Sequence, residues 1–371
     1  MKYSSRCVDW FSSRFGDQEF LLTPSCSQAM RWSMELFPRP QRGGPEEALV
    51  PSFTHPAIAN ALLWRGWKLR FIDIEPQTCN LDMDKVAEAL SVRTGWIICM
   101  HYGGFACDLD KLKKLLSSSK IRWAEDNAHG LWARHGNTLL GGHGDLSWFS
   151  FEKQKNIQCG EGGGVLISKR LSIPGLREKY HSGTNRQAYL SGEVSEYNWQ
   201  TLGGKYDLPE LSCAYLLGQL EEVEKITERR LRLWKQYHEL LQPLREKEGI
   251  RLPLPRSYQQ HNGHIYFIIL RSAFQRKQLQ NRLARQGIET HSHYVPLHQS
   301  PMGKAFPFHG LDKYSSNYAT RLLRLPIHAD MREQDINRVV ESVYQLLSPK
   351  VYRGESDLEK EKLGESLRET H

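Results

Sequence analysis

Long apolar runs are missing from this sequence. No segment approaches the roughly 20 apolar residues that a membrane-spanning helix needs. The first residues, 1–15, are polar and contain Arg6 and Asp9, so they lack the pattern of a secretory signal peptide. We therefore expect a cytoplasmic protein without a membrane partner.

Paired cysteine motifs are also missing. The sequence has seven cysteines, an odd number, at wide spacings and with no Cys-x-x-Cys motif. This pattern argues against a disulfide framework and a zinc knuckle, and it is typical of proteins in a reducing compartment.

Charge of one sign is not concentrated anywhere. The 50 Lys and Arg residues exceed the 42 Asp and Glu residues, which gives a net charge of +8, but they are spread along the chain. Nucleic-acid binding would require a basic stripe or a recognisable module, so we expect no nucleic-acid partner. The excess fits a solvated surface or a cleft for an anionic metabolite.

What is present is the composition of a globular protein. Hydrophobic residues make up 39% of the 371 positions and charged residues 25%, which excludes collagen-like and wholly disordered chains. At roughly 150 residues per domain, the length indicates two or three domains. We expect a large domain over 1–245, a small C-terminal domain over 246–349, and a polar, mobile tail over 350–371.

Short apolar runs and helical patterns alternate between residues 45 and 170. Such alternation predicts a largely parallel sheet with helices on both faces, in which ligands bind beyond the carboxyl ends of the strands. The expected strands are 48–51, 69–74, 96–100, 121–125, 146–151 and 165–168. The expected helices between them are 56–64, 83–90 and 109–117.

A long helical pattern follows at 208–241, and Gly218 inside it allows a break. Beyond it, a strand at 264–270 and helices at 275–286 and 336–347 predict a second, smaller α/β unit. The predicted fold class is therefore α/β.

An acidic pair, Glu125 and Asp126, ends one expected strand and leads into Asn127-Ala128-His129. Such a pair could bind a metal, act as a base, or hold a protonated nitrogen of a heterocycle. Asp126 could equally cap a turn through the backbone N–H of Ala128 or His129. The pattern alone leaves these interpretations open.

Ser150 and Lys155 lie at and just beyond the end of the next expected strand, ahead of the glycine-rich run 160–164. The serine hydroxyl could donate to an oxyanion, and a lysine in apolar surroundings can form a Schiff base. Lys155 could also be an ordinary surface lysine, as Lys153 is expected to be. The glycines lack the context of a dinucleotide-binding motif.

Small hydroxyl residues mark a third feature, Thr23-Pro24-Ser25-Cys26-Ser27-Gln28-Ala29, which leads into an expected helix at 30–36. Such residues are ordinary helix caps, but the N–H groups of a helix start also bind phosphate. A phosphate cradle, an acid for a ring nitrogen and a Schiff-base lysine are together what pyridoxal phosphate (PLP) requires.

Seven blocks, in order along the chain, resemble the DegT/DnrJ/EryC1/StrS family of PLP-dependent sugar aminotransferases. The resemblance covers residues 10–348. It implies a fold type I enzyme with a large domain on a mostly parallel mixed sheet, a smaller C-terminal α/β domain, and a homodimer with shared active sites. The blocks are LLTPSCS (21–27), VPSFT (50–54), HYGGFACDL (101–109), EDNAH (125–129), residues 149–163, GTNR (183–186) and YVPLH (294–298).

The resemblance implies roles for three residues near the reacting end of the cofactor. Lys155 matches the lysine that forms the Schiff base and then acts as general base and acid. Asp126 matches the aspartate that pairs with the pyridine nitrogen. His129 stands where the family has Gln or His near the cofactor's O3′.

Four further residues are implied in cofactor binding. Ser150 matches the serine on the phosphate, and the backbone N–H groups of Ser27 and Gln28 match the helix start that also holds it. His55 stands where family members usually have an aromatic residue stacked on the ring.

The resemblance further implies glutamate as amino donor and a nucleotide-linked 4-keto-6-deoxy sugar as acceptor, with dTDP-4-keto-6-deoxyglucose expected. Similar members serve the synthesis of lipopolysaccharide and of enterobacterial common antigen. The implied substrate-binding residues are Asn185, Arg186, Tyr294 and His298.

Two alternatives remain open. Related sugar dehydratases have histidine in place of the Schiff-base lysine, so Lys155 favours transamination. The other alternative is a PLP-binding paralogue with reduced or lost turnover. It is suggested because family members have a longer segment before the position of Met1, and many of them put Asn or Arg where this sequence has Asp207.

Three histidines, His291, His293 and His298, include a His-x-His pair that could bind a metal. In the resembled family this segment lines the nucleotide-sugar cleft and no metal is used. We therefore expect no metal.

Overall fold

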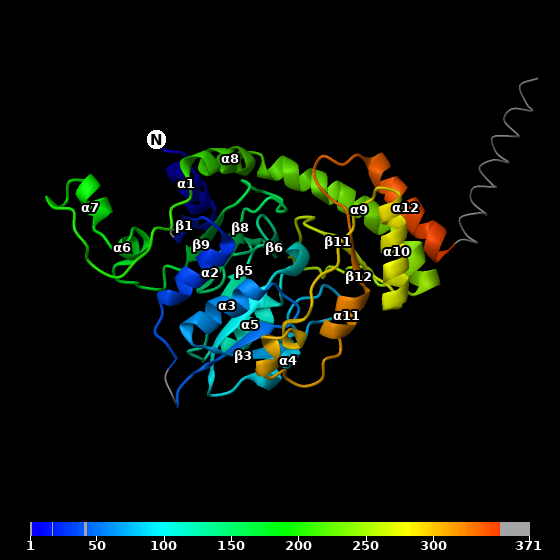
Figure 1. Ribbon diagram of the computed structural model, residues 1–371, viewed down its shortest axis with the longest axis horizontal. Helices are drawn as coiled ribbons and strands as arrows, with labels where there is room; N and C mark the ends of the chain where they lie inside the picture. The colour runs from blue at the N-terminus through cyan, green and yellow to red at the C-terminus, as the bar shows by residue number, and fades with distance from the viewer. Residues whose placement is uncertain (1, 17, 41–42, 349–371) are drawn as a thin grey trace, which may run out of the picture. The chain divides into compact units, whose positions relative to one another are not determined.

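The computed structural model describes residues 2–16, 18–40 and 43–348 (Figure 1). The tail expected at 350–371 lies outside these ranges. The chain divides into two compact units that interleave along the sequence, whereas the predicted domains are continuous, so the boundary at residue 245 stays a prediction. The first unit comprises Met1–Glu228, Pro255–His264 and Tyr294–Ser316, and the second comprises Arg229–Leu254, Ile265–His293 and the described residues from Asn317 onward.

Helices and strands alternate along the first unit, as the sequence predicts. The helices of the chain are α1 (Tyr3–Phe15), α2 (Cys26–Glu35), α3 (Pro56–Arg65), α4 (Met83–Ala89), α5 (Leu109–Leu116), α6 (Leu176–Tyr180), α7 (Arg186–Leu190), α8 (Glu210–Glu221), α9 (Val223–Glu248), α10 (Ala273–Arg285), α11 (Ser315–Arg321) and α12 (Glu333–Leu347). The short 3-10 helices are η1 (Tyr102–Gly104), η2 (Leu297–Gln299) and η3 (Gly303–Ala305). The strands are β1 (Glu19–Thr23), β2 (Glu47–Pro51), β3 (Lys68–Ile72), β4 (Thr94–Met100), β5 (Arg122–Asp126), β6 (Arg134–His135), β7 (Thr138–Leu139), β8 (Leu146–Ser150), β9 (Gly163–Ile167), β10 (Gln259–Gln260), β11 (Tyr266–Ile269) and β12 (Leu322–Leu325).

The centre of the first unit is a seven-stranded mixed sheet with the strand order β1-β9-β8-β5-β4-β2-β3. The strands from β8 to β3 are parallel, and β9 runs antiparallel to both β8 and β1. All six predicted strands are present, and their ends differ from the expected ones by no more than two residues. β1 is an addition, because none of the strands predicted from the sequence covers residues 19–23.

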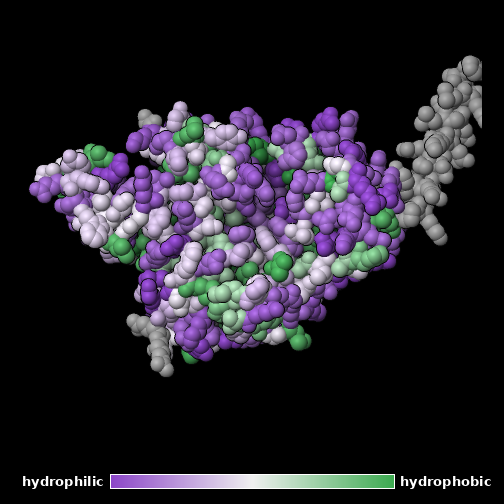
Figure 2. Space-filling view, in the orientation of Figure 1, coloured by the Kyte–Doolittle hydropathy of each residue, from purple (hydrophilic) through white to green (hydrophobic). Residues whose placement is uncertain are grey.

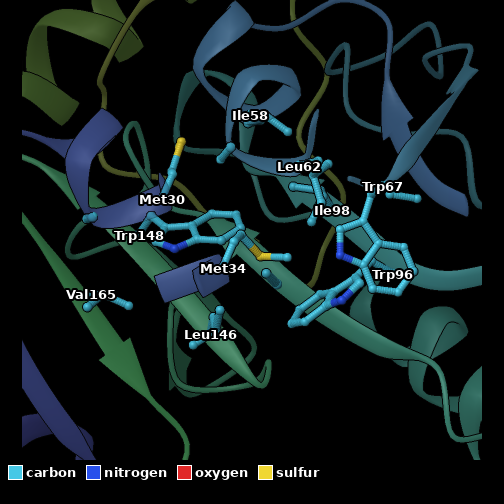
Figure 3. Close-up of a cluster of buried hydrophobic side chains, with 14 of the residues drawn as sticks. Met30, Met34, Ile58, Leu62, Trp67, Trp96, Ile98, Leu146, Trp148 and Val165 are labelled. Atoms are coloured by element: carbon cyan, nitrogen blue, oxygen red, sulfur yellow. The ribbon is translucent and has the colours of Figure 1, made fainter. Parts of the chain in front are cut away.

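Alternate side chains of the strands pack under helices on the two faces of the sheet. On β4, Trp96 and Ile98 join the core that contains α2 and α3, whereas Ile97 and Cys99 join the core that contains α4 and α5. Successive strand residues point to opposite faces, so a nearly continuous apolar strand requires cover on both. Figure 3 shows the first of these cores, with labelled side chains that include Met30, Met34, Ile58, Leu62, Trp96, Ile98 and Trp148.

The predicted long helix is two helices in the structure. The interruption falls at Glu222, between α8 and α9, and not at Gly218, which continues α8. α9 also passes the expected end at residue 241 and contains Pro243. Proline removes a helical hydrogen bond, but Leu241 and Leu244 on either side are fully buried, so packing holds the helix together.

The second unit is built on a two-stranded antiparallel sheet in which β11 pairs with β12. The strand and the two helices that the sequence predicts for this unit are present as β11, α10 and α12. Within the described ranges, no helix combines the length and the apolar character that crossing a membrane requires.

Candidate functional site

The three sequence features that suggest chemistry meet at one edge of the sheet. Ser150, the last residue of β8, pairs with Gly163 of β9, which in turn pairs with Thr23 at the end of β1. α2 then begins at Cys26. Asp126 is the last residue of β5, the neighbour of β8. The expected ligand edge of an α/β sheet is therefore where these residues lie.

Gly163 allows the sheet to pass directly beneath the start of α2. A Cβ on this residue would lie 2.3 Å from the backbone nitrogen of Cys26 and 2.5 Å from the carbonyl carbon of Ser25. Real Cβ atoms do not approach backbone atoms so closely. The glycine therefore lets β9 pack directly against the first turn of a ten-residue helix, and the N–H groups of such a turn stabilise an anion.

We expect Gly163→Ala to force β9 and the start of α2 apart, and so to weaken both folding and the binding of a phosphate-bearing ligand. The contacts are with backbone atoms that no rotamer change can move, so the expected loss of stability is about 1–3 kcal/mol. Thermal unfolding and PLP titration would measure both effects.

Gly218→Ala is the matched control for that change. Gly218 lies inside α8 with nothing within 4 Å of the added carbon, so alanine should stabilise the protein by about 0.5–1 kcal/mol. Equal stability of the two alanine variants would contradict the tight fit at Gly163.

The start of α2 differs in one respect from the expected phosphate cradle. The helix begins at Cys26, four residues before the expected helix at 30–36, with Ser25 as its N-cap. The Ser25 hydroxyl accepts the N–H of Gln28 at 3.2 Å, so this N–H is already bound. A phosphate contact through Gln28 would require the Ser25 hydroxyl to turn away, whereas Ser27 lies exposed in the first turn.

The acidic pair at the end of β5 separates into two groups with different environments. Glu125 is fully buried and accepts hydrogen bonds from His101 Nε2 at 2.9 Å and from the backbone N–H groups of Gly141, His143 and Gly144, each at 2.8 Å. Burial alone would raise the pKa of Glu125, but His101 and these donors hold it at about 2. Glu125 therefore fixes a loop. It does not combine with Asp126 to bind a metal or to act as a base.

We expect Glu125→Gln to destabilise the fold strongly. The amide nitrogen would face N–H donors, which leaves buried groups without acceptors at a cost of about 3–5 kcal/mol. Because the pKa of Glu125 is lower in the folded state, its contribution is present above about pH 4.5 and is lost as the pH falls toward 2, by roughly 3 kcal/mol. Urea unfolding at pH 6, 4 and 3 would show a shallower pH dependence in the variant.

Glu239→Gln, at an exposed position on α9, is the control for that substitution. It should leave both the unfolding free energy and its dependence on pH close to those of the unchanged protein. If Glu125→Gln behaved in the same way, the assigned role of Glu125 would be wrong.

Asp126 faces a different set of groups. Its side chain is 2% exposed, and its Oδ1 accepts the N–H of Ala128 at 3.0 Å, so it makes the turn cap that was one of the interpretations left open by the sequence. Burial raises the pKa of Asp126, although the Ala128 bond and the charges of Lys155 and His55 act in the opposite direction. The ionised carboxylate would therefore be favoured further by another positive charge.

Lys155 lies in the turn between β8 and β9, where its N–H donates to the carbonyl of Glu152 at 2.9 Å. The lysine is partly buried, and its charge lowers the pKa of Asp126, so the two groups are within electrostatic range. Lys153, two residues earlier, is exposed as expected. His55 caps α3 by accepting the N–H of Ala57 at 3.2 Å, and it also lies within range of Asp126.

The hydrogen bonding of His129 identifies which of its ring nitrogens is the donor. His129 is 5% exposed, and its Nδ1 accepts the N–H of Gly103 at 3.3 Å. The neutral ring must therefore carry its proton on Nε2. Asn262 and His264, which the sequence analysis missed, contact this region from the segment Pro255–His264.

The expected substrate-binding residues fall into two places. Asn185 and Arg186 lie on an arm, residues 181–205, that projects from the first unit at the left of Figure 1. The Asn185 side chain is bound within this arm to the backbone of Glu196 and Asn198. Contact of Asn185 and Arg186 with substrate stays a prediction.

Tyr294 and His298 lie beside the end of β2. The Tyr294 ring is 5.5 Å from that of Phe53. His298 Nδ1 is 2.5 Å from Ser52 Oγ, and its Nε2 is 2.9 Å from Asp312 Oδ2. His298 thus ties its segment to the sheet, and substrate contact by either residue stays a prediction.

The three histidines considered for a metal have separate partners. His291 lies 3.2 Å from Glu289, His293 contacts Arg324, and His298 is held as above. In the part of the chain that the structure describes, no group of three or more His, Cys, Asp or Glu side chains is arranged to hold a metal ion.

Comparisons with known proteins agree with this arrangement. A model of the DegT/DnrJ/EryC1/StrS aminotransferase family matches residues 9–344. The uncharacterised protein MJ1066 of Methanocaldococcus jannaschii is 28% identical over 312 residues, which cover 82% of this chain and 80% of that protein. The spore coat polysaccharide biosynthesis protein SpsC of Bacillus subtilis is 25% identical over 350 residues, or 91% and 87% of the two chains. The solved structure of the aminotransferase TlmJ from Streptoalloteichus hindustanus shares the fold, with a TM-score of 0.82, 24% identity, and coverage of 94% and 92%.

Proposed function

Because the chain belongs to the DegT/DnrJ/EryC1/StrS aminotransferase family, which depends on PLP, we propose that it transfers an amino group from glutamate to a nucleotide-linked 4-keto-6-deoxy sugar. The proposed acceptor is dTDP-4-keto-6-deoxyglucose, and the product is a 4-amino sugar nucleotide. The observation that carries the proposal is the buried Asp126 at the end of β5 with the charge of Lys155 acting on it.

The chain is a PLP-dependent aminotransferase of fold type I. The mostly parallel mixed sheet with helices on both faces is the architecture of its structural relatives, which confirms the fold class predicted from the sequence. The proposed roles of individual residues rest on the geometry of the sheet edge, whereas the proposed amino donor and sugar rest on the family resemblance.

The residues at the sheet edge fit PLP in charge and in shape. Asp126 would hold the pyridine nitrogen, because a protonated ring nitrogen supplies the positive charge that favours the ionised carboxylate. The start of α2, which packs against Gly163, offers backbone N–H groups that suit the phosphate. Ser150, at the end of β8, would donate its hydroxyl to the same phosphate.

Three further side chains would act on the ring and on the reacting carbon. His129 would donate its Nε2–H to the ring oxygen, and His55 would lie against the ring face. When bound, PLP supplies a ring that accepts electrons from the carbon bearing the amino group. Lys155 would carry the cofactor on Nζ and, once released, would take the proton from one carbon and return it to the next.

A sugar-nucleotide substrate agrees with the function of a relative and with the net charge of the chain. SpsC is a polysaccharide biosynthesis protein. The net charge of +8 would favour an anionic diphosphate. All seven cysteines are free thiols, which supports a reducing cytoplasm, where we propose that the enzyme acts.

We propose that the enzyme is a homodimer in which the arm, residues 181–205, contacts the second subunit. Large apolar side chains of the arm are open to solvent: Leu190 is 68% exposed, Trp199 76% and Leu202 85%. Figure 2 shows hydrophobic residues among the hydrophilic ones on this projection. A row of such side chains on a stable soluble domain is typical of a protein interface.

Trp199→Asp with Leu202→Asp should shift the enzyme from dimer to monomer, because the contact would have to bury two carboxylates. Sedimentation velocity measures the change. Val92→Asp, at an apolar residue that is 93% exposed outside the arm, is the control and should leave the assembly unchanged. A dimer that survives the double substitution would place the interface elsewhere.

A spectroscopic half-reaction tests the proposed chemistry. The protein is loaded with pyridoxamine phosphate, keto-sugar nucleotides are added one at a time, and the return of the lysine-bound cofactor band is recorded. We expect dTDP-4-keto-6-deoxyglucose to restore the band, and glutamate to reverse the change. If UDP- or GDP-linked keto sugars restore it instead, the proposed nucleotide is wrong.

The same experiment separates the alternatives. A paralogue without turnover would bind PLP but would transfer nothing to any keto-sugar nucleotide. A dehydratase would consume the sugar nucleotide without forming an amino sugar. Lys155, which the dehydratases replace with histidine, favours the transaminase over the second alternative.

A further inference from the structure

A short buried segment bridges the two loops that carry the proposed cofactor residues. Asn262, which is 1% exposed, donates through Nδ2 to the carbonyl oxygens of His129 at 2.9 Å and Leu131 at 2.8 Å. Its Oδ1 accepts the N–H of His264 at 3.1 Å. A Cβ on Gly104 would lie 2.1 Å from this Oδ1, so the chain leaves room for the asparagine side chain.

The other end of the bridge reaches the residue after Lys155. His264 Nδ1 lies 2.8 Å from Asn156 Oδ1, and Asn156 Nδ2 donates to the carbonyl of Asn262 at 3.0 Å. The second bond fixes the orientation of the Asn156 amide, because only its nitrogen can donate to a carbonyl. His264 must therefore carry a proton on Nδ1 and donate it to Asn156.

The imidazole of His264 also lies on that of His129. The two ring centroids are 4.3 Å apart and the ring planes are inclined by 33°. Two protonated imidazoles at this distance would repel each other, and the Gly103 N–H already occupies Nδ1 of His129. The contact therefore favours a neutral His129, and the Gly103 bond places its proton on Nε2.

We propose that Asn262 and His264 are positioning residues that hold Lys155 and His129 at a fixed separation, with the Nδ1–H of His264 as the donor that ties the two loops together. The inference rests on the proposed function. Asp126 and His129 follow β5 while Lys155 follows β8, so bonds across the two loops determine how precisely the groups align. Displacement of reacting groups by about 1 Å can lower a rate by about 10²-fold.

Two substitutions of His264 separate its hydrogen bond from its bulk. His264→Asn places an amide nitrogen where Nδ1 stands, so it can still donate to Asn156. His264→Phe keeps a flat ring on His129 but has no donor. We expect the phenylalanine variant to lose 10- to 100-fold in kcat with a smaller change in KM, and the asparagine variant to recover most of this loss.

Cofactor binding gives a readout that does not depend on turnover. We expect His264→Phe to shift the absorbance maximum of the lysine-bound cofactor and to weaken PLP retention on gel filtration. His264→Asn should resemble the unchanged protein in both measurements. Equal loss in both variants, with equal melting temperatures, would overturn the role assigned to the Nδ1–H donor.

Asn156→Ala removes the acceptor of the His264 Nδ1–H and leaves His264 in place, so it keeps the test decisive if His264→Phe is poorly folded. Alone it should reproduce the loss of kcat and the shifted absorbance maximum expected for His264→Phe. A kcat and an absorbance maximum like those of the unchanged protein would overturn the inference. Failure of the unchanged protein to bind PLP would instead contradict the proposed function, so the two failures are distinguishable.

Discussion

Lys155→Ala should lower the rate of amino transfer by at least about 10³-fold, because it removes both the proposed attachment of the cofactor and the group proposed to move the proton. The single turnover of pyridoxamine phosphate with a keto-sugar nucleotide measures the effect directly. The fold should be unaffected, since the partly buried side chain extends from a turn and not from the core. Added PLP should no longer give the lysine-bound absorbance band.

Lys153→Ala is the matched control, since this lysine is in the same turn but is exposed. It should retain the band and a rate close to that of the unchanged enzyme. An unchanged rate in Lys155→Ala would show that another group carries the proton, and the proposed mechanism would be wrong.

Asp126→Asn should lower the rate by about 10²–10³-fold while leaving the protein folded. Asparagine removes the negative charge that we propose keeps the ring nitrogen protonated, but its oxygen can still accept the N–H of Ala128. Loss of rate should therefore occur without a large change in melting temperature. Single-turnover kinetics and thermal unfolding on the same samples would separate the two effects.

The control for Asp126 is Asp84→Asn, at an exposed position on α4. Its charge pairs with Lys111 at the surface, so the rate should not change. If Asp126→Asn lost both rate and stability, the carboxylate would be a structural group of the kind that Glu125 is. The pairing with a ring nitrogen would then lose its support.

The sheet of the first unit was predictable because it is covered on both faces. Strands such as β4 are apolar at nearly every position and are followed by turns and amphipathic helices, so the sequence marks them clearly. The carboxyl ends of these strands then indicated where Asp126 and Ser150 would lie. The family resemblance added roles that spacing alone left open.

The features of the fold and the site that the sequence did not predict depend on contacts between residues far apart in the chain. Asn262 and Asn156 are separated by 106 positions, and neither belongs to a pattern that suggests the other. No proline or glycine marks the interruption of the long helix at Glu222. Gly218, where the sequence allows a break, continues α8 instead. The environment of Glu125 depends on the path of the loop through Gly141, which local sequence does not determine.

Glu125 and Asp126, at the end of β5, lie in different environments, and this difference predicts different phenotypes for mutations at the two positions. Glu125 and Asp126 are adjacent in the gene, yet one carboxylate holds a loop and the other faces the proposed cofactor. Mutant alleles at codon 125 should be temperature-sensitive and should respond to chaperone levels, since they impair folding. Alleles at codon 126 should be equally defective at every growth temperature and should leave protein abundance unchanged.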